Sequence, residues 1–115
     1  MALESTPAAD LLRIVELRPA PGVLLLEAHG EIDLVTAPIL REAVSAAADR
    51  LVVDLGGVTF LACCGLQVLL ECTRRRPTAL VGTSHHAVAL PLRVSGLASA
   101  FTTYPSRDAV PASCG

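Results

Sequence analysis

Two adjacent cysteines, Cys63 and Cys64, are the residues of this chain with the most evident chemistry. They follow an apolar run at Leu51–Leu55 and a turn signal at Gly56–Gly57, and they precede an expected helix that starts at Gly65. The first turn of a helix presents unpaired backbone N–H groups and a partial positive charge. A nucleophilic side chain there is well placed to carry or meet negative charge, so this turn is the candidate functional site.

Several roles are open to the two thiols. A helix N-terminus lowers a thiol pKa, which would suit a redox-responsive pair, but no Cys-x-x-Cys spacing is present. A Cys–His enzyme would use Cys64 with His85 or His86, yet no orienting group or oxyanion motif accompanies them. A metal site that adds Cys72 and a histidine matches no common zinc spacing. We favour the interpretation that Cys63 and Cys64 replace serines as small side chains, and we predict no enzyme activity, metal or cofactor.

Length and composition limit the class of protein. The chain has 115 residues, enough for one domain, and 52% of them are hydrophobic. Only 3% are aromatic, so the core must be aliphatic. The net charge of −2 gives no electrostatic reason to expect nucleic acid. No apolar run approaches the roughly 18 residues of a membrane span, and the N-terminus lacks a signal-peptide pattern. We therefore expect a cytoplasmic protein with reduced cysteines and no membrane contact.

The hydrophobic pattern predicts alternating strands and helices. Strands are expected at 11–17, 23–28, 51–55, 78–81 and 101–104. The first helix should follow Thr36 as its N-cap and reach Ala47, with Pro38 in its first turn. Two more helices are expected over 65–75 and over 86–94, the latter kinked by Pro91 and stopped by Gly96. This order predicts an α/β domain with a mixed sheet of four to five strands and helices mainly on one face.

Three further expectations concern boundaries and charged residues. The domain should span residues 11–110, with a flexible N-terminus at 1–10 and a short C-terminal tail at 111–115. Asp54 is expected near a strand end, hydrogen-bonded to local backbone. Arg74–Arg76 is expected to be a solvated helix end, favoured by the helix dipole.

Four segments, in this order and spacing, resemble the STAS domain family, and within it the bacterial anti-sigma factor antagonists. The resemblance covers roughly residues 11–108, and its segments are Gly30–Pro38, Val52–Phe60, Gly65-Leu66 with the helix that follows, and Val94–Leu97 before Phe101. The resemblance implies a STAS-like single domain. It also implies a protein partner, an anti-sigma factor of the serine-kinase type, whose capture frees a sigma factor.

In such proteins the kinase phosphorylates a serine in an Asp-Ser-Ser-Gly-Leu motif, and the phosphate breaks the complex. This chain reads Ala62–Leu66 there, and Cys64 matches the acceptor serine. A thiol is not expected to accept phosphate from a serine kinase, so the charge switch should be missing. The residues that the resemblance assigns to partner binding are Asp33, Thr36, Ala62, Cys63, Cys64, Gly65 and Leu66.

We therefore expect a regulatory protein that binds an anti-sigma factor and indirectly promotes sigma-dependent transcription, without serine phosphorylation control. One alternative is a STAS-like accessory subunit of a transport or signalling complex. Another is a thiol-based, redox-responsive variant that depends on Cys63 and Cys64.

Overall fold

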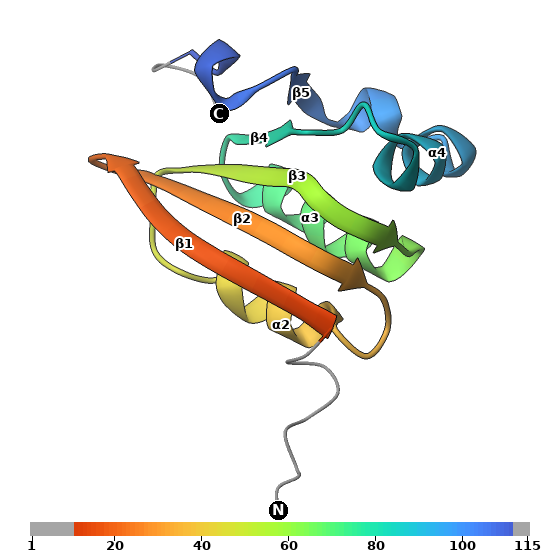
Figure 1. Ribbon diagram of the computed structural model, residues 1–115. Helices are drawn as coiled ribbons and strands as arrows, with labels where there is room; N and C mark the ends of the chain where they lie inside the picture. Colours follow the sequence, from red (N-terminus) through yellow and green to blue (C-terminus); the bar gives the residue numbers. More distant parts are fainter. Residues whose placement is uncertain (1–10, 112–115) are drawn as a thin grey trace, which may run out of the picture.

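A five-stranded sheet forms the centre of the protein, as seen in a computed structural model that describes residues 11–111 (Figure 1). The strands lie in the order β1–β2–β3–β4–β5, and their bounds are Leu12–Ala20, Val23–Ile32, Arg50–Leu61, Thr78–Val81 and Thr102–Tyr104. β1 pairs antiparallel with β2, and the remaining neighbours pair in parallel. This mixed sheet confirms the predicted fold class. The expected flexible segment 1–10 and residues 112–115 of the tail lie outside the described residues.

Within the described range, three α-helices connect the parallel strands. They are α2 (Ala37–Val44), α3 (Cys63–Arg75) and α4 (His86–Ser95). Gly96 ends α4 with a φ of 76°, as the sequence predicted, and Pro91 lies inside the helix. The 3-10 helices Ala98–Ala100 and Arg107–Ala109 flank β5. None of the helices in the described part of the chain is long and apolar enough to cross a membrane.

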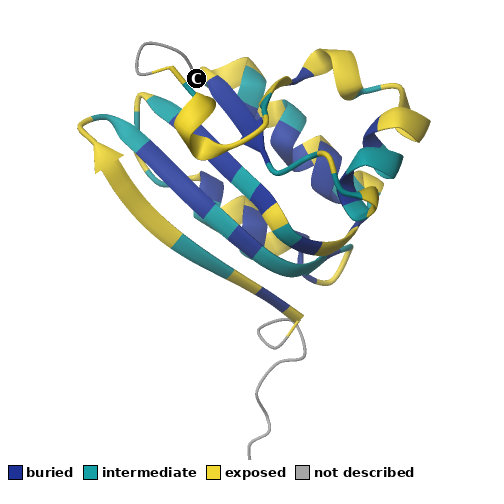
Figure 2. Ribbon diagram, turned by 45° about the horizontal axis from the view of Figure 1, so that its top comes forward, coloured by how far each residue is buried: buried dark blue, intermediate teal, exposed yellow. Residues whose placement is uncertain are grey.

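The main core lies between the helices and one face of the sheet (Figure 2). Alternate residues of the central strands point into it, so the period of two seen in the sequence places Leu24 and Leu26 on this face and Leu25 on the other. The helices contribute aliphatic side chains such as Leu40, Leu69 and Val88, all of them fully buried. The core is predominantly aliphatic, as predicted, and Phe101 and Cys72 are the exceptions in it.

β3 extends further than the sequence predicted. Gly56–Gly57 was expected to be a turn, but both residues belong to the strand. The pairing with β2 shifts there, from Glu27 opposite Asp54 to His29 opposite Gly57, which marks a bulge in β3. A Cβ on Gly57 would lie 2.4 Å from His29 Nδ1, so glycine permits the close approach of the two strands. Asp54 is consequently in mid-strand instead of near a strand end, although its Oδ1 does accept a local hydrogen bond from the Gly56 N–H over 2.8 Å.

The opposite face of the sheet carries no α-helix from residues 11–111. A small apolar cluster lies there, formed by buried side chains with Val23, Tyr104 and Val110 packed against them. The buried members are Leu25, Val52, Ala79 and Val81. In Figure 1 this face is turned toward the viewer, with the C-terminal segment above it. We call it the open face.

Candidate protein-docking site

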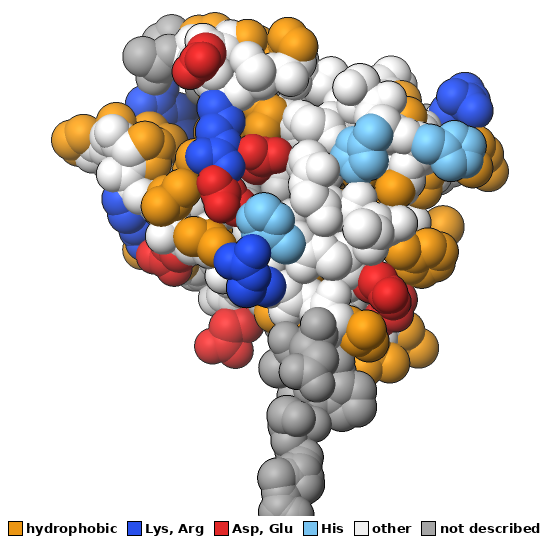
Figure 3. All heavy atoms as spheres, viewed as in Figure 1, with side chains coloured by type: hydrophobic (Ala, Val, Ile, Leu, Met, Phe, Trp, Pro, Cys, Tyr) orange, Lys and Arg blue, Asp and Glu red, His pale blue; other side chains and the backbone are white. Residues whose placement is uncertain are grey.

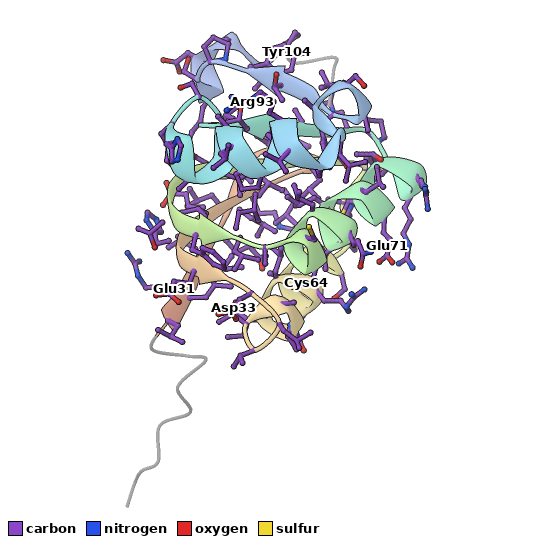
Figure 4. All side chains as sticks on the ribbon, turned by 90° about the vertical axis from the view of Figure 1, so that its right-hand side faces the viewer. Glu31, Asp33, Cys64, Glu71, Arg93 and Tyr104 are labelled. Carbon is purple, nitrogen blue, oxygen red and sulfur yellow. The ribbon has the colours of Figure 1, made fainter. Side chains whose placement is uncertain are left out.

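The loop before α2 and the start of α3 lie side by side because β2 and β3 are parallel neighbours. Ile32, the last residue of β2, pairs with Leu61, the last residue of β3. The backbone N–H of Ala62 then donates to the Ile32 carbonyl over 2.8 Å. Figure 4 shows Asp33 and Cys64 together at this edge of the molecule. Two segments 30 residues apart in sequence thus form one surface, as their shared sheet edge requires.

Asp33 and Thr36 hold the loop in a fixed shape. Asp33 Oδ1 accepts hydrogen bonds from the backbone N–H of Val35 at 2.9 Å and of Thr36 at 3.0 Å. The Thr36 hydroxyl donates to the Glu31 carbonyl at 2.8 Å and accepts from the Asp33 N–H at 2.8 Å. Thr36 is completely buried. The two residues therefore shape the loop through hydrogen bonds within it.

The expected capping role of Thr36 is not seen. Thr36 does occupy the N-cap position of α2, and proline does lie in the first turn. Its side chain makes no capping hydrogen bond, because its hydroxyl already bonds to Glu31 and Asp33. The helix also ends at Val44, three residues before the expected Ala47. The predicted helix start was therefore correct, and the predicted role of the threonine was wrong.

The fixed loop presents two apolar side chains to solvent. Leu34 is 80% exposed and Val35 is 60% exposed. Sequence reasoning placed the Asp33–Thr36 loop on the contact surface but named neither side chain, although two large apolar residues between Asp33 and Thr36 were a usable signal. Exposed aliphatic side chains on a rigid loop are typical of a surface that another protein covers.

The start of α3 carries no side-chain cap. Ala62 has the extended backbone of an N-cap residue, with φ −93° and ψ 167°, but no oxygen to accept a hydrogen bond. The helix begins at Cys63, two residues earlier than predicted. Its first i to i−4 bond runs from the Leu66 N–H to the Ala62 carbonyl. The N–H groups of Cys63 and Cys64 precede that bond, so they lie where helix donors have no intrahelical partner.

The predicted site residues at the start of α3 differ in how far they are exposed to solvent. Cys63 is exposed and Cys64 is half-buried. Gly65 and Leu66 are buried. A Cβ on Gly65 would lie 2.5 Å from Ile32 Cγ2 and 2.9 Å from Leu61 Cδ1, so only glycine lets α3 pack this closely on the strands. The buried pair therefore positions the helix, and the thiols form its surface.

The structure offers little to the Cys–His and metal alternatives. The His85 Nε2 atom lies 2.8 Å from the Val58 carbonyl oxygen, and His86 is exposed at the start of α4. Cys72 is buried inside α3, and burial raises its pKa. Among the residues that the structure describes, no group of three His, Cys, Asp or Glu side chains is arranged to hold a metal ion.

The C-terminal end of α3 corrects another expectation. Arg76 is not a solvated helix end: its Nη1 donates to the carbonyls of Ala46 at 2.9 Å and Ala48 at 3.1 Å, and its Nη2 donates to the Val44 carbonyl. Arg74 and Arg75 are exposed, as expected. Arg76 therefore connects the end of α3 to the end of α2 and the segment that leads into β3.

Comparison with known proteins places the chain in a family. A family model of the STAS domain matches residues 15–110, so the chain belongs to the STAS domain family. A crystal structure of an anti-sigma factor antagonist from Mycobacterium paratuberculosis is 30% identical, with a TM-score of 0.76 over 90% of this chain and 92% of that one. The antagonist-type family is a non-enzymatic regulatory fold, in agreement with the sequence-based prediction.

Two more distant structures share the fold. The anti-sigma factor antagonist SpoIIAA in its unphosphorylated form is 16% identical, with a TM-score of 0.67 over 84% of this chain and 92% of that one. The murine anion transporter Slc26a9 is 18% identical, with a TM-score of 0.62 over 79% of this chain but only 17% of the transporter. Comparison with curated proteins gave no match.

Proposed function

We propose that this protein is an anti-sigma factor antagonist-like regulator that acts in the cytoplasm. It binds an anti-sigma factor of the kinase fold and so indirectly promotes sigma-dependent transcription. The observation that carries the proposal is the pair of exposed side chains, Leu34 and Val35, on a rigid loop beside the uncapped start of α3. The 30% identical antagonist supports the choice of partner class.

The proposed contact surface consists of Leu34, Val35, Ala62, Cys63 and Cys64, and we call it the docking edge. It is apolar with thiols at its centre, and it offers unpaired helix N–H donors to a partner. The other predicted site residues act from beneath. Their role is to fix the loop and seat α3, and they are Asp33, Thr36, Gly65 and Leu66.

Phosphorylation control is absent in this proposal. SpoIIAA, the more distant antagonist, has been solved in both an unphosphorylated and a phosphorylated form. The segment Ala62–Leu66 of this chain contains no hydroxyl side chain that could accept a phosphoryl group. A phosphate would add a charge of about −1.5 to −2 to an apolar contact surface, so its absence predicts a persistent complex.

The binding claim is tested by calorimetry with a kinase-fold anti-sigma factor captured by pull-down. Leu34→Asp should weaken binding at least about tenfold, because it places a charge in an apolar contact that the partner would bury. Leu17→Asp is the matched control, since Leu17 is an exposed leucine on β1. Equal binding by both variants would rule out the docking edge.

The phosphorylation claim is tested by incubating the protein with the same kinase and labelled ATP. We expect no phosphate on residues 62–66 of the natural chain. Cys64→Ser with Ala62→Asp restores the acceptor serine and the aspartate of the family motif and should restore modification at position 64, with release of the partner. A phosphorylated residue in this turn of the unmodified chain would contradict the proposal.

A transport assembly is the second candidate partner, because the fold also occurs within the murine anion transporter. Pull-down from cells separates the two: a kinase-fold anti-sigma factor supports the proposal, and a transporter subunit in its place overturns it.

A further inference from the structure

The C-terminal segment lies on the open face of the sheet and is joined to it by charge. This segment comprises residues 105–111, and we call it the strap. Its Arg107 donates from Nε to Asp54 Oδ2 over 2.8 Å and from Nη2 to Glu27 Oε2. These partners lie 53 and 80 residues away in sequence. One guanidinium therefore joins the strap to two neighbouring strands, β2 and β3.

The sheet alone, without the strap, brings two carboxylates together and so forms a site for a cation. Glu27 of β2 and Asp54 of β3 are direct partners in the parallel register, so their side chains share the open face. Like charges at such neighbouring positions destabilise a sheet. His29 Nε2 lies 3.4 Å from Glu27 Oε1. Figure 3 shows acidic, basic and histidine side chains gathered on this face.

The protonation of the cluster agrees with this geometry. The hydrogen bond from Arg107, and next the one from His29, hold the pKa of Glu27 below its usual value. The same contact with Glu27, and next that with Asp54, raises the pKa of Arg107. Arg107 therefore favours the charged form of Glu27, and its guanidinium is the cation that the two carboxylates share.

The strap covers an apolar strip. Val110 packs against the cluster that contains Leu25 and Val52, each only 7% exposed. Beside it, an open groove of about 600 Å³ runs between the strap and the β1–β2 hairpin, lined by residues that include Leu17, Val23 and Val110. The regular structure of the strap is one 3-10 helix of three residues, Arg107–Ala109, which is too short to be stable by itself. Its position therefore depends on its contacts with the sheet.

We propose that the strap is a detachable cover: it is held closed by the Arg107 ion pairs, and it opens locally to expose the apolar strip of the open face. The side chains of Arg107, Glu27 and Asp54 are 39%, 23% and 21% exposed, so water and salt reach the pairs. Ion pairs of this kind are weak and are screened by salt. Opening therefore requires no unfolding of the helix-side core. This inference is independent of the docking edge.

Arg107 itself supplies the test, because trypsin cleaves after arginine and must capture this side chain. The rate of cleavage between Arg107 and Asp108 is measured by mass spectrometry and divided by the rate for a free peptide of residues 103–111. We expect Glu27→Gln with Asp54→Asn to raise this ratio roughly fivefold. Added salt should raise the ratio for the natural chain and leave the variant unchanged. Glu71→Gln is the control, because it removes a different exposed pair, with Arg41.

Two results would overturn the strap. Equal cleavage after Arg107 in the natural chain and the double variant would show that the ion pairs do not hold it. Faster cleavage of the double variant after Arg41 as well, in the middle of α2, would show that the whole domain opens and that the strap is no separate unit. Faster cleavage after Arg107 alone supports the proposal.

Discussion

The two ends of α3 are built in opposite ways. At the C-terminal end, Arg76 bonds to three carbonyl groups at the end of α2 and in the segment that follows it. Arg41 of α2 and Glu71 of α3 form an ion pair at 2.9 Å nearby. At the N-terminal end, Ala62 supplies no cap, and the exposed Cys63 lies beside a loop with exposed leucine and valine side chains.

The contrast separates a structural end from the end that we propose to bind a partner. Polar groups that are satisfied within the chain fix the position of the helix and leave little for a partner to bind. An uncapped helix start next to apolar side chains keeps both hydrogen-bond donors and hydrophobic area available. Loss of stability on substitution should therefore be greatest where α3 is anchored, and loss of binding greatest at the docking edge.

The largest expected effect tests how α3 is seated. Gly65→Val should destabilise the protein by about 3 kcal/mol, because its Cβ would fall within 2.5 Å of Ile32 Cγ2 and force the helix away from the strands. Urea unfolding followed by circular dichroism measures the free energy of unfolding. Gln67→Val on the exposed face of the same helix is the control. Equal losses in the two variants would refute the close approach as the cause.

The next effect tests the anchored end. Arg76→Ala should cost about 2 kcal/mol, since it leaves several carbonyl groups without their charged donor. Arg75→Ala, next to it and exposed, should change the free energy of unfolding by less than about 0.5 kcal/mol. The same urea titration compares them. A loss at Arg75 as large as that at Arg76 would mean that charge alone, and not the carbonyl contacts, stabilises this end.

A smaller effect of opposite sign is expected at the other end. Ala62→Asp places a carboxylate at an N-cap whose backbone is already extended, and it should stabilise α3 by about 1 kcal/mol. Thermal unfolding of the two proteins measures the gain. Ala62→Leu serves as the control, since leucine has no oxygen to cap the helix. If Ala62→Asp gave no gain, the helix start would not be short of a cap.

The sequence was sufficient for much of this architecture. The alternating order of strands and helices and the mixed sheet follow from hydrophobic periodicity and turn residues, and the structure has both. The bulge at Gly56–Gly57 did not follow, because glycine pairs signal a turn unless the neighbouring strand is known to approach. Here the evidence is the close approach of His29, on the neighbouring strand β2, to Gly57, and no local pattern reveals that approach.

The candidate site shows the same limit. Local patterns located Thr36 at the helix start, but they held no sign that its hydroxyl bonds backward to Glu31. Nor did they reveal that Arg76 reaches the carbonyls of Val44–Ala48, about 30 residues earlier in the chain. Long-range polar contacts of this kind leave no periodic trace in a sequence, whereas hydrophobic burial does.

The finest test of the contrast uses the thiols at both ends of α3. Cys63 is exposed at the start, and Cys72 is buried near the end, where burial raises its pKa. A raised pKa means a smaller thiolate fraction at any given pH, so Cys72 should react later in an alkaline titration than an ordinary thiol. In a Cys114→Ser background, iodoacetamide labelling read by mass spectrometry should modify Cys63 roughly tenfold faster or more. Urea should abolish the difference, because unfolding exposes both thiols equally. Fast labelling of Cys72 in the native protein would show that the anchored end opens as readily as the docking edge, and the distinction between the two ends would fail.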